Sequence, residues 1–183
     1  MRWYWIDRFL EFESGRYAKA IKNISLAEDH LHDHFPSYPM IPNSLVLEGL
    51  AQTGGLLVCE HNRFTEKVIL AKVSKAEFFC EAVPGDTLTY TATIEYIKEE
   101  GAMVSATSHK GAVLHAEAEL VFAHLNDPHM GTLFEPETFL HMMRLLGAFE
   151  VGHAADGSRL KPPPELEDVA GNPADDNGKK DAS

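Results

Sequence analysis

The feature that most constrains the fold is an apolar run over residues 44–59, which contains a single carboxylate, Glu48. Its large apolar side chains fall on every side of a helix, so a helix over residues 43–61 would have almost no polar face. Such a helix must be enclosed by other structure. Pro42 stands just before its expected first turn, and Asn43 or Ser44 is expected to cap it.

Short alternating segments flank this run and predict strands. A hairpin is expected over residues 9–24, around a turn at residues 13–16. Beyond the helix, strands are expected at residues 68–72, 75–80, 87–98, 102–110 and 113–125. One buried helix enclosed by long antiparallel strands predicts an α+β fold.

The composition changes after Leu125 and divides the chain into three parts. Residues 1–125 form the predicted domain. Residues 126–151 form an extension with an amphipathic helix at 135–149, which is expected to pack on the sheet or on a partner subunit; a lid over a binding site is the alternative. Residues 152–183 have too few large apolar side chains to fold alone and are expected to be a disordered acidic tail.

Charge and cysteine usage exclude several classes of protein. Sixteen basic and 28 acidic residues give a net charge of −12, which disfavours general nucleic-acid binding. Cys59 and Cys80 lie in apolar segments without metal-ligand spacing, so buried thiols in a reducing compartment are expected. No signal peptide and no run of about 20 apolar residues is recognisable, and we expect a soluble, cytoplasmic protein without a membrane span.

His34 and Glu48 are the candidate acid/base pair. His34 leads a loop rich in proline into the predicted helix, and Glu48 lies inside that helix. Histidine titrates near neutral pH, and apolar surroundings favour the protonated form of a carboxyl group. The alternatives are a hydrogen-bonded surface histidine and a glutamate with a structural hydrogen bond. Gln52, one turn beyond Glu48, is expected to orient Glu48 or the loop.

The segment His34-Phe35-Pro36-x-x-Pro39-x-x-Pro42, followed by Leu45-Val46-Leu47-Glu48-Gly49-Leu50-Ala51-Gln52, resembles the signature of the β-hydroxyacyl-(acyl-carrier-protein) dehydratases of the FabZ/FabA type. Further similar segments lie at residues 5–8, 20–24, 71–78, 83–88 and 116–120, so the resemblance covers about residues 3–125. It implies the hot-dog fold, a long helix wrapped by a curved antiparallel sheet. It also implies homodimers, which in FabZ-type proteins often assemble as trimers of dimers.

The resemblance implies a mechanism for dehydrating a 3-hydroxyacyl thioester on an acyl carrier protein or coenzyme A. His34 would remove the proton next to the thioester carbonyl, and Glu48 of the other protomer would protonate the leaving hydroxyl. The backbone N–H of Asn43 would stabilise the thioester oxygen, with Gln52, Pro42 and Phe35 in support. No cofactor is implied. Glutamate at position 48 favours the FabZ type over the FabA type.

Other residues leave alternatives open. His30, His32 and His34 alternate as in a strand, which suggests a metal site, but the resemblance accounts for His34 alone and no metal is expected. Five basic residues are expected to be solvated charges or a docking patch for an acidic carrier protein: Arg16, Lys19, Lys22, Lys72 and Lys75.

Three positions depart from the family pattern. Asp33, Ser37 and Asn43 stand where the family commonly has glycine, which puts rate and substrate preference in question. The alternative functions are a hot-dog thioesterase, in which Glu48 activates water, and a non-catalytic acyl-binding or scaffold protein.

Overall fold

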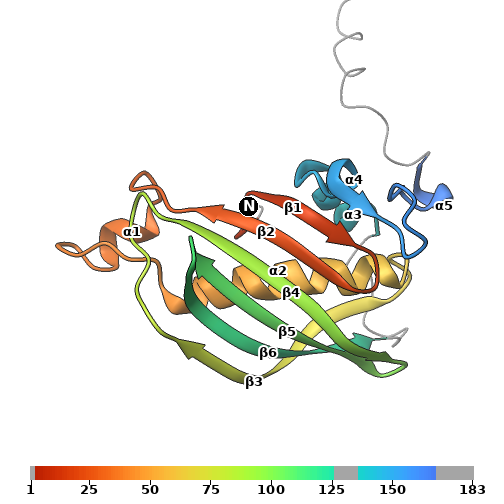
Figure 1. Cartoon of the computed structure of the whole chain (residues 1–183), viewed down its shortest axis with the longest axis horizontal. Coiled ribbons are helices and arrows are strands. Elements are labelled where there is room, and N and C mark those ends of the chain that lie inside the picture. Colours follow the sequence, from red (N-terminus) through yellow and green to blue (C-terminus); the bar gives the residue numbers. More distant parts are fainter. Residues whose placement is uncertain (1–2, 126–135, 168–183) are drawn as a thin grey trace, which may run out of the picture.

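The computed structural model describes residues 3–125 and 136–167 (Figure 1). Its strands form one sheet with the order β3-β6-β5-β4-β2-β1-β7, in which every pairing is antiparallel except β1 with β7. The strands are β1 (Arg8–Glu13), β2 (Tyr17–Asn23), β3 (Lys67–Phe78), β4 (Thr87–Lys98), β5 (Gly101–Lys110), β6 (Val113–Leu125) and β7 (Gly152–His153). The helices are α1 (His30–Asp33), α2 (Asn43–His61), α3 (Pro136–Leu145), α4 (Ala148–Val151) and α5 (Pro164–Glu167).

Helix α2 lies along the curved sheet, as the apolar run predicts (Figure 1). Gly49 and Gly54 allow the close approach, because a Cβ atom on Gly49 would lie 2.5 Å from the Tyr90 ring and one on Gly54 3.0 Å from Val104. The expected cap is wrong. Helix α2 begins at Asn43 itself, so Pro42 holds the N-cap position and no side chain caps the helix. The α+β fold is confirmed.

The strands follow the predicted alternation, with one difference. In β4, Leu88, Tyr90 and Ala92 are buried, whereas the threonines between them are half-buried. The two short strands expected at 68–72 and 75–80 are one strand, β3, with irregularities in its pairing with β6 at residues 70–72 and 73–75. Bulges of this kind interrupt the alternation without ending the strand, which explains the predicted break.

The C-terminal extension packs on the β1 side of the sheet (Figure 1). The helix expected over residues 135–149 is interrupted after Leu145, because Gly147 adopts a left-handed conformation with φ of 71° and separates α3 from α4. The N–H of Phe9 donates to the carbonyl of Leu146 at 2.8 Å, which ties the extension to β1. Residues 126–135 lie outside the described residues.

The prediction of a disordered tail from residue 152 onward is wrong for residues 152–167. Gly152 and His153 form β7 beside β1, and α5 follows at Pro164–Glu167. Leu160 is buried, and its N–H donates to the carbonyl of Gly152 at 3.0 Å. This segment is therefore held by β7 and by two leucines that pack on the core, Leu160 and the partly buried Leu166. Residues 168–183 lie outside the described residues.

Both cysteines are free thiols. Cys59 is buried in α2, and this burial raises the pKa of its thiol to about 12, so it is poorly reactive. Cys80 is half-buried, which is less than the sequence led us to expect. Among the described residues, no helix combines the length and apolar character needed to cross a membrane.

Candidate active site

His34 lies in the loop between α1 and α2 and is half-buried. Its Nδ1 lies 3.2 Å from the carbonyl oxygen of Met40, whose N–H donates to the carbonyl of His34 at 3.0 Å. Because a carbonyl oxygen can only accept, a neutral His34 must carry its proton on Nδ1. The lone pair on Nε2 is therefore available to accept a proton from a substrate.

The rest of the loop is held against the connection between β3 and β4. Phe35 and Tyr38 exchange backbone hydrogen bonds, which places Ser37 in a tight turn. The Tyr38 hydroxyl donates to Glu81 at 2.7 Å, and the Phe35 ring stacks on His34 with 4.3 Å between centroids. Phe35 and Tyr38 are 52% and 53% exposed, so the loop presents two aromatic rings at the surface, of which the Phe35 ring lies against the candidate base.

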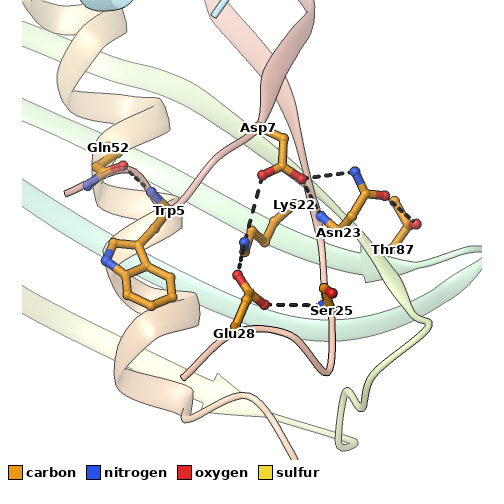
Figure 2. A network of polar contacts seen from close by, with 8 residues as sticks. All are labelled: Trp5, Asp7, Lys22, Asn23, Ser25, Glu28, Gln52 and Thr87. Atoms are coloured by element: carbon orange, nitrogen blue, oxygen red, sulfur yellow. Dashed lines mark hydrogen bonds and ion pairs between the residues drawn. The ribbon is translucent and has the colours of Figure 1, made fainter. Parts of the chain in front are cut away.

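Glu48 lies on the second turn of α2 and is only half-buried in the single chain, less than expected from the apolar run. Its Oε1 accepts a hydrogen bond from Gln52 Nε2 at 2.9 Å. The Gln52 amide is held by the backbone at the N-terminus, where Nε2 also donates to the carbonyl of Trp3 at 2.9 Å. Its Oε1 accepts from the N–H of Trp5 at 2.8 Å (Figure 2). Gln52 therefore contacts Glu48, as the sequence predicts.

The backbone groups of Trp3 and Trp5 were missed by sequence reasoning. An N–H or carbonyl group is present at almost every residue, so nothing in the sequence marks these two as partners of Gln52. Their effect is to fix which end of the amide faces Glu48. The amide oxygen is taken by a donor, the Trp5 N–H, so the NH₂ end faces the carboxyl group.

Within one chain, no hydrogen bond or ion pair joins His34 and Glu48. Among the described residues, the side-chain hydrogen bonds of His34 and Glu48 are to Met40 and Gln52, respectively. The single chain therefore presents an oriented base and an oriented acid without joining them.

Among the described residues, no acceptor pairs with the backbone N–H groups of Asn43 and Ser44 at the start of α2. The carbonyl of Pro42 accepts from the N–H groups of Leu45 and Val46, and Asn43 is exposed at the first helical position. The first turn carries neither an acidic side chain nor a side-chain cap. The positive end of the helix dipole is therefore open to an oxygen that gains negative charge.

The histidine cluster differs from the expectation. His30 and His32 lie on helix α1 rather than on a strand. The His30 ring packs edge-on against Trp5, and burial lowers its pKa, whereas His32 contacts the carbonyl of Leu26. Among the described residues, no group of three potential metal ligands gathers at one place. Asp33 is exposed and makes no hydrogen bond or ion pair with His34.

The five basic residues do not form one patch. Lys22 is only 6% exposed and lies between Asp7 and Glu28 (Figure 2), so its assignment as a surface charge or docking residue is wrong. Arg16 and Lys19 pair with Glu13 and Glu11 on the β1–β2 hairpin. Lys75 pairs with Glu117 and Glu77 on the β3 side, where Lys72 is exposed. Strands β6, β5 and β4 separate the two groups.

A long helix enclosed by a curved antiparallel sheet, with a candidate acid and base near the helix start, defines a hot-dog protein of the dehydratase type. A family model described as the FabA-like domain matches residues 3–122, and the chain belongs to this family. The curated relatives to which it is similar include proteins of the FabZ type. The 3-hydroxyacyl-(acyl-carrier-protein) dehydratase FabZ of Pelotomaculum thermopropionicum is 35% identical over 119 residues, which cover 64% of this chain and 85% of that protein.

Two further similarities agree with this. FabZ of Streptococcus pyogenes is 39% identical over 121 residues, which cover 64% of this chain and 85% of that protein. Among solved structures, a Streptococcus mutans protein bound to acetyl CoA has a TM-score of 0.55 at 13% identity, with 68% of this chain and 93% of that chain covered. At this identity the structural likeness shows the fold alone.

Proposed function

We propose that this protein dehydrates a 3-hydroxyacyl-(acyl-carrier-protein) to the trans-2-enoyl thioester in fatty-acid synthesis. The observation that carries the proposal is the retention, within the region that matches the FabA-like family, of an oriented histidine base and a glutamate held by an amide. The carrier protein is assigned because the relatives named above are dehydratases of acyl-carrier-protein substrates.

His34 acts as the base in this proposal. Its Nε2 takes the proton from C2, next to the thioester carbonyl, while the Met40 carbonyl holds Nδ1–H. The negative charge that develops on the thioester oxygen is stabilised by the N–H of Asn43 and the helix dipole at the start of α2.

Glu48 acts as the acid. Gln52 donates to Oε1, so in this proposal Oε2 carries the proton that Glu48 gives to the leaving hydroxyl. The C3–O bond breaks as Glu48 protonates the leaving hydroxyl, and water departs. The electron pair of the broken C2–H bond becomes the new C=C bond. His34 then returns its proton, through solvent, to the Glu48 carboxylate.

We propose that the acid and base of one site come from two protomers of a homodimer. Two observations support this: no hydrogen bond or ion pair joins His34 and Glu48 within a chain, and β3 leaves its outer edge unpaired among the described strands. Pairing through β3 would continue the sheet into a second copy. Trimers of such dimers are the further assembly that the family resemblance implies.

The test is to incubate the purified protein with a 3-hydroxyacyl-(acyl-carrier-protein) or its enoyl product, following enoyl absorbance and free thiol together. Interconversion without thiol release is expected, and His34→Ala and Glu48→Ala should each lower kcat by about 100-fold or more. Thiol release would assign a thioesterase instead. If neither enoyl absorbance nor free thiol changes for acyl chains of several lengths, on both the carrier protein and coenzyme A, a non-catalytic acyl-binding protein would be favoured.

Mixed dimers test the shared site directly. When His34→Ala and Glu48→Ala chains are co-expressed, each mixed dimer has one site with both groups intact if the site is shared. Random pairing should then restore about a quarter of wild-type activity, because half the dimers are mixed and each has one working site of two. No recovery in dimers shown to be mixed would place acid and base in the same chain.

A further inference from the structure

Lys22 occupies a position where a lysine is unusual. It follows Ala18 and Ala20 in the alternation of β2 and, like them, is buried toward the core. An ammonium group taken out of water is costly unless it is paired. Here it is paired twice, with Glu28 and with Asp7, whose Oδ1 lies 3.7 Å away (Figure 2).

The carboxylate of Asp7 holds the segment that supports Glu48. Asp7 Oδ2 accepts from the N–H of Asn23 at 2.6 Å and from its side-chain amide at 2.9 Å. The N–H of Asp7 donates to the carbonyl of Ile21 at 2.7 Å. Two residues before Asp7, the N–H of Trp5 holds the Gln52 amide that contacts Glu48. Fixing Asp7 therefore fixes the backbone that orients the candidate acid.

The carboxylate of Glu28 holds the segment that leads to His34. Glu28 Oε2 accepts from the N–H of Ser25 at 3.2 Å, which closes the turn after β2. The carbonyl of Glu28 accepts from the N–H of Leu31 at 3.0 Å in α1, and α1 is followed directly by His34.

Trp5 lies between the two segments. Its ring packs edge-on against His30 of α1, with 5.1 Å between the ring centroids. Lys22 Nζ lies 5.8 Å from the centroid of the Trp5 ring. Trp5 also donates its N–H to Gln52. The N-terminal segment and α1 therefore pack against one another close to Lys22, which pairs with Asp7 of the first and with Glu28, two residues before the second.

We infer that Lys22 is a positioning residue that holds the base loop and the acid support in register through Glu28 and Asp7. The inference rests on the proposed function for its effect on rate, but its effect on the two segments is independent of any activity. If the site is shared between protomers, each Lys22 supports the base of one site and the acid of the other.

The test compares Lys22→Met with Lys22→Arg, which can still bridge two carboxylates, and with Lys98→Met, an exposed lysine on β4. Below its unfolding temperature, Lys22→Met should lower kcat by about ten- to a hundredfold, since small displacements of reacting groups are costly, with KM changed less than about twofold. Lys22→Arg should recover most of kcat, and Lys98→Met should match the wild type. Wild-type kcat in folded Lys22→Met would overturn the inference.

Variants of one carboxylate at a time separate the effect of Asp7 from that of Glu28, and they can be used if Lys22→Met does not fold. Asp7→Asn should move the alkaline limb of the pH–rate profile, which reports the acid, and Glu28→Gln the acidic limb, which reports the base. A purely structural role would lower the unfolding temperature of both variants while leaving both limbs in place, and would overturn the inference.

Hydrogen exchange makes the outcome independent of catalysis. Asp7→Asn should speed amide exchange in residues 3–7, and Glu28→Gln in residues 30–34, with Lys98→Met unchanged. If the wild type is inactive on every thioester but these segments respond, the proposed function fails and the inference stands. If neither segment responds, the inference fails whatever the activity.

Discussion

The two edges of the sheet are finished in different ways. At the β1 edge the chain covers itself: β7 pairs with β1, and the N–H of Ser14 donates to the carbonyl of His153 at 2.9 Å. At the other edge β3 runs for 12 residues, most of them exposed, and no described strand pairs with its outer side. An uncovered edge of this length presents a row of free N–H and carbonyl groups.

The difference separates what one chain completes from what it leaves to a partner. The strand that covers the β1 edge, β7, belongs to the residues after 135, beyond the region that matches the FabA-like family. The open edge is built by residues inside that region. We therefore expect damage at the open edge to abolish assembly and catalysis together, and damage at the covered edge to lower stability while leaving assembly intact.

The largest effect should come from a charge on the open edge. Leu70 on β3 is 38% exposed, and pairing with a second β3 would bury it. Leu70→Lys should shift the protein toward monomers and lower activity at least about tenfold, because the cost of burying an unpaired charge exceeds a few kcal/mol. Light scattering coupled to gel filtration gives the assembly state, and the dehydratase assay gives the rate.

Leu145→Lys is the matched control. Leu145 is an exposed leucine at the end of α3, on the covered side, and should keep wild-type assembly and activity when replaced. Dimers that persist in Leu70→Lys would show that subunits do not pair through β3.

A smaller effect should come from the covered edge. A Cβ atom at Gly152 would lie 2.5 Å from the carbonyl oxygen of Ala148 and 2.8 Å from Leu160. Gly152→Val should therefore displace β7 and lower the free energy of unfolding by about 1–3 kcal/mol. His153→Val, at the exposed neighbouring position, is the control. Urea unfolding measures the loss; a change in the oligomeric state of Gly152→Val would contradict the separation of the two edges.

Much of the fold could be predicted because its signals are local. The all-round apolar run predicts the bounds of α2, and alternation predicts β4 and β6 with the observed bounds. The prediction was wrong where the pattern of apolar residues does not show an irregularity of the backbone. The bulges of β3 read as a gap between strands, and Gly147 divides a helix whose apolar spacing continues through it.

The candidate site divides in the same way. His34, Glu48 and Gln52 could be selected from type and spacing, and the observed contact between Gln52 and Glu48 agrees with this. Lys22 was assigned to the surface because lysine is usually solvated, and only the position of Asp7 and Glu28 in space makes a buried lysine acceptable. Partners brought together by folding leave no local pattern.

The smallest predicted effect is a pH dependence of stability that arises from Glu60, at the C-terminal end of α2 beside the extension. Glu60 lines a cavity of about 640 Å³ together with Phe64 and residues 158–164 of the extension. Its Oε2 is buried without a partner among the described residues, and burial raises its pKa, partly opposed by a hydrogen bond from Ser14. The folded chain therefore holds this proton at pH values where the unfolded chain has released it.

The sign follows from this difference. Stability is unaffected by Glu60 below the ordinary carboxyl pKa and falls as the pH rises toward the raised value in the folded state. Glu60→Gln should raise the unfolding temperature by a few degrees at neutral pH and by nothing near pH 4. Glu99→Gln, an exposed carboxylate in the β4–β5 turn, should show no such gap. Gly152→Val should shrink the gap, because displacing the cover readmits water to Glu60. A gap that persists unchanged in that background would mean that the extension does not shield Glu60, and that the covered edge protects only itself.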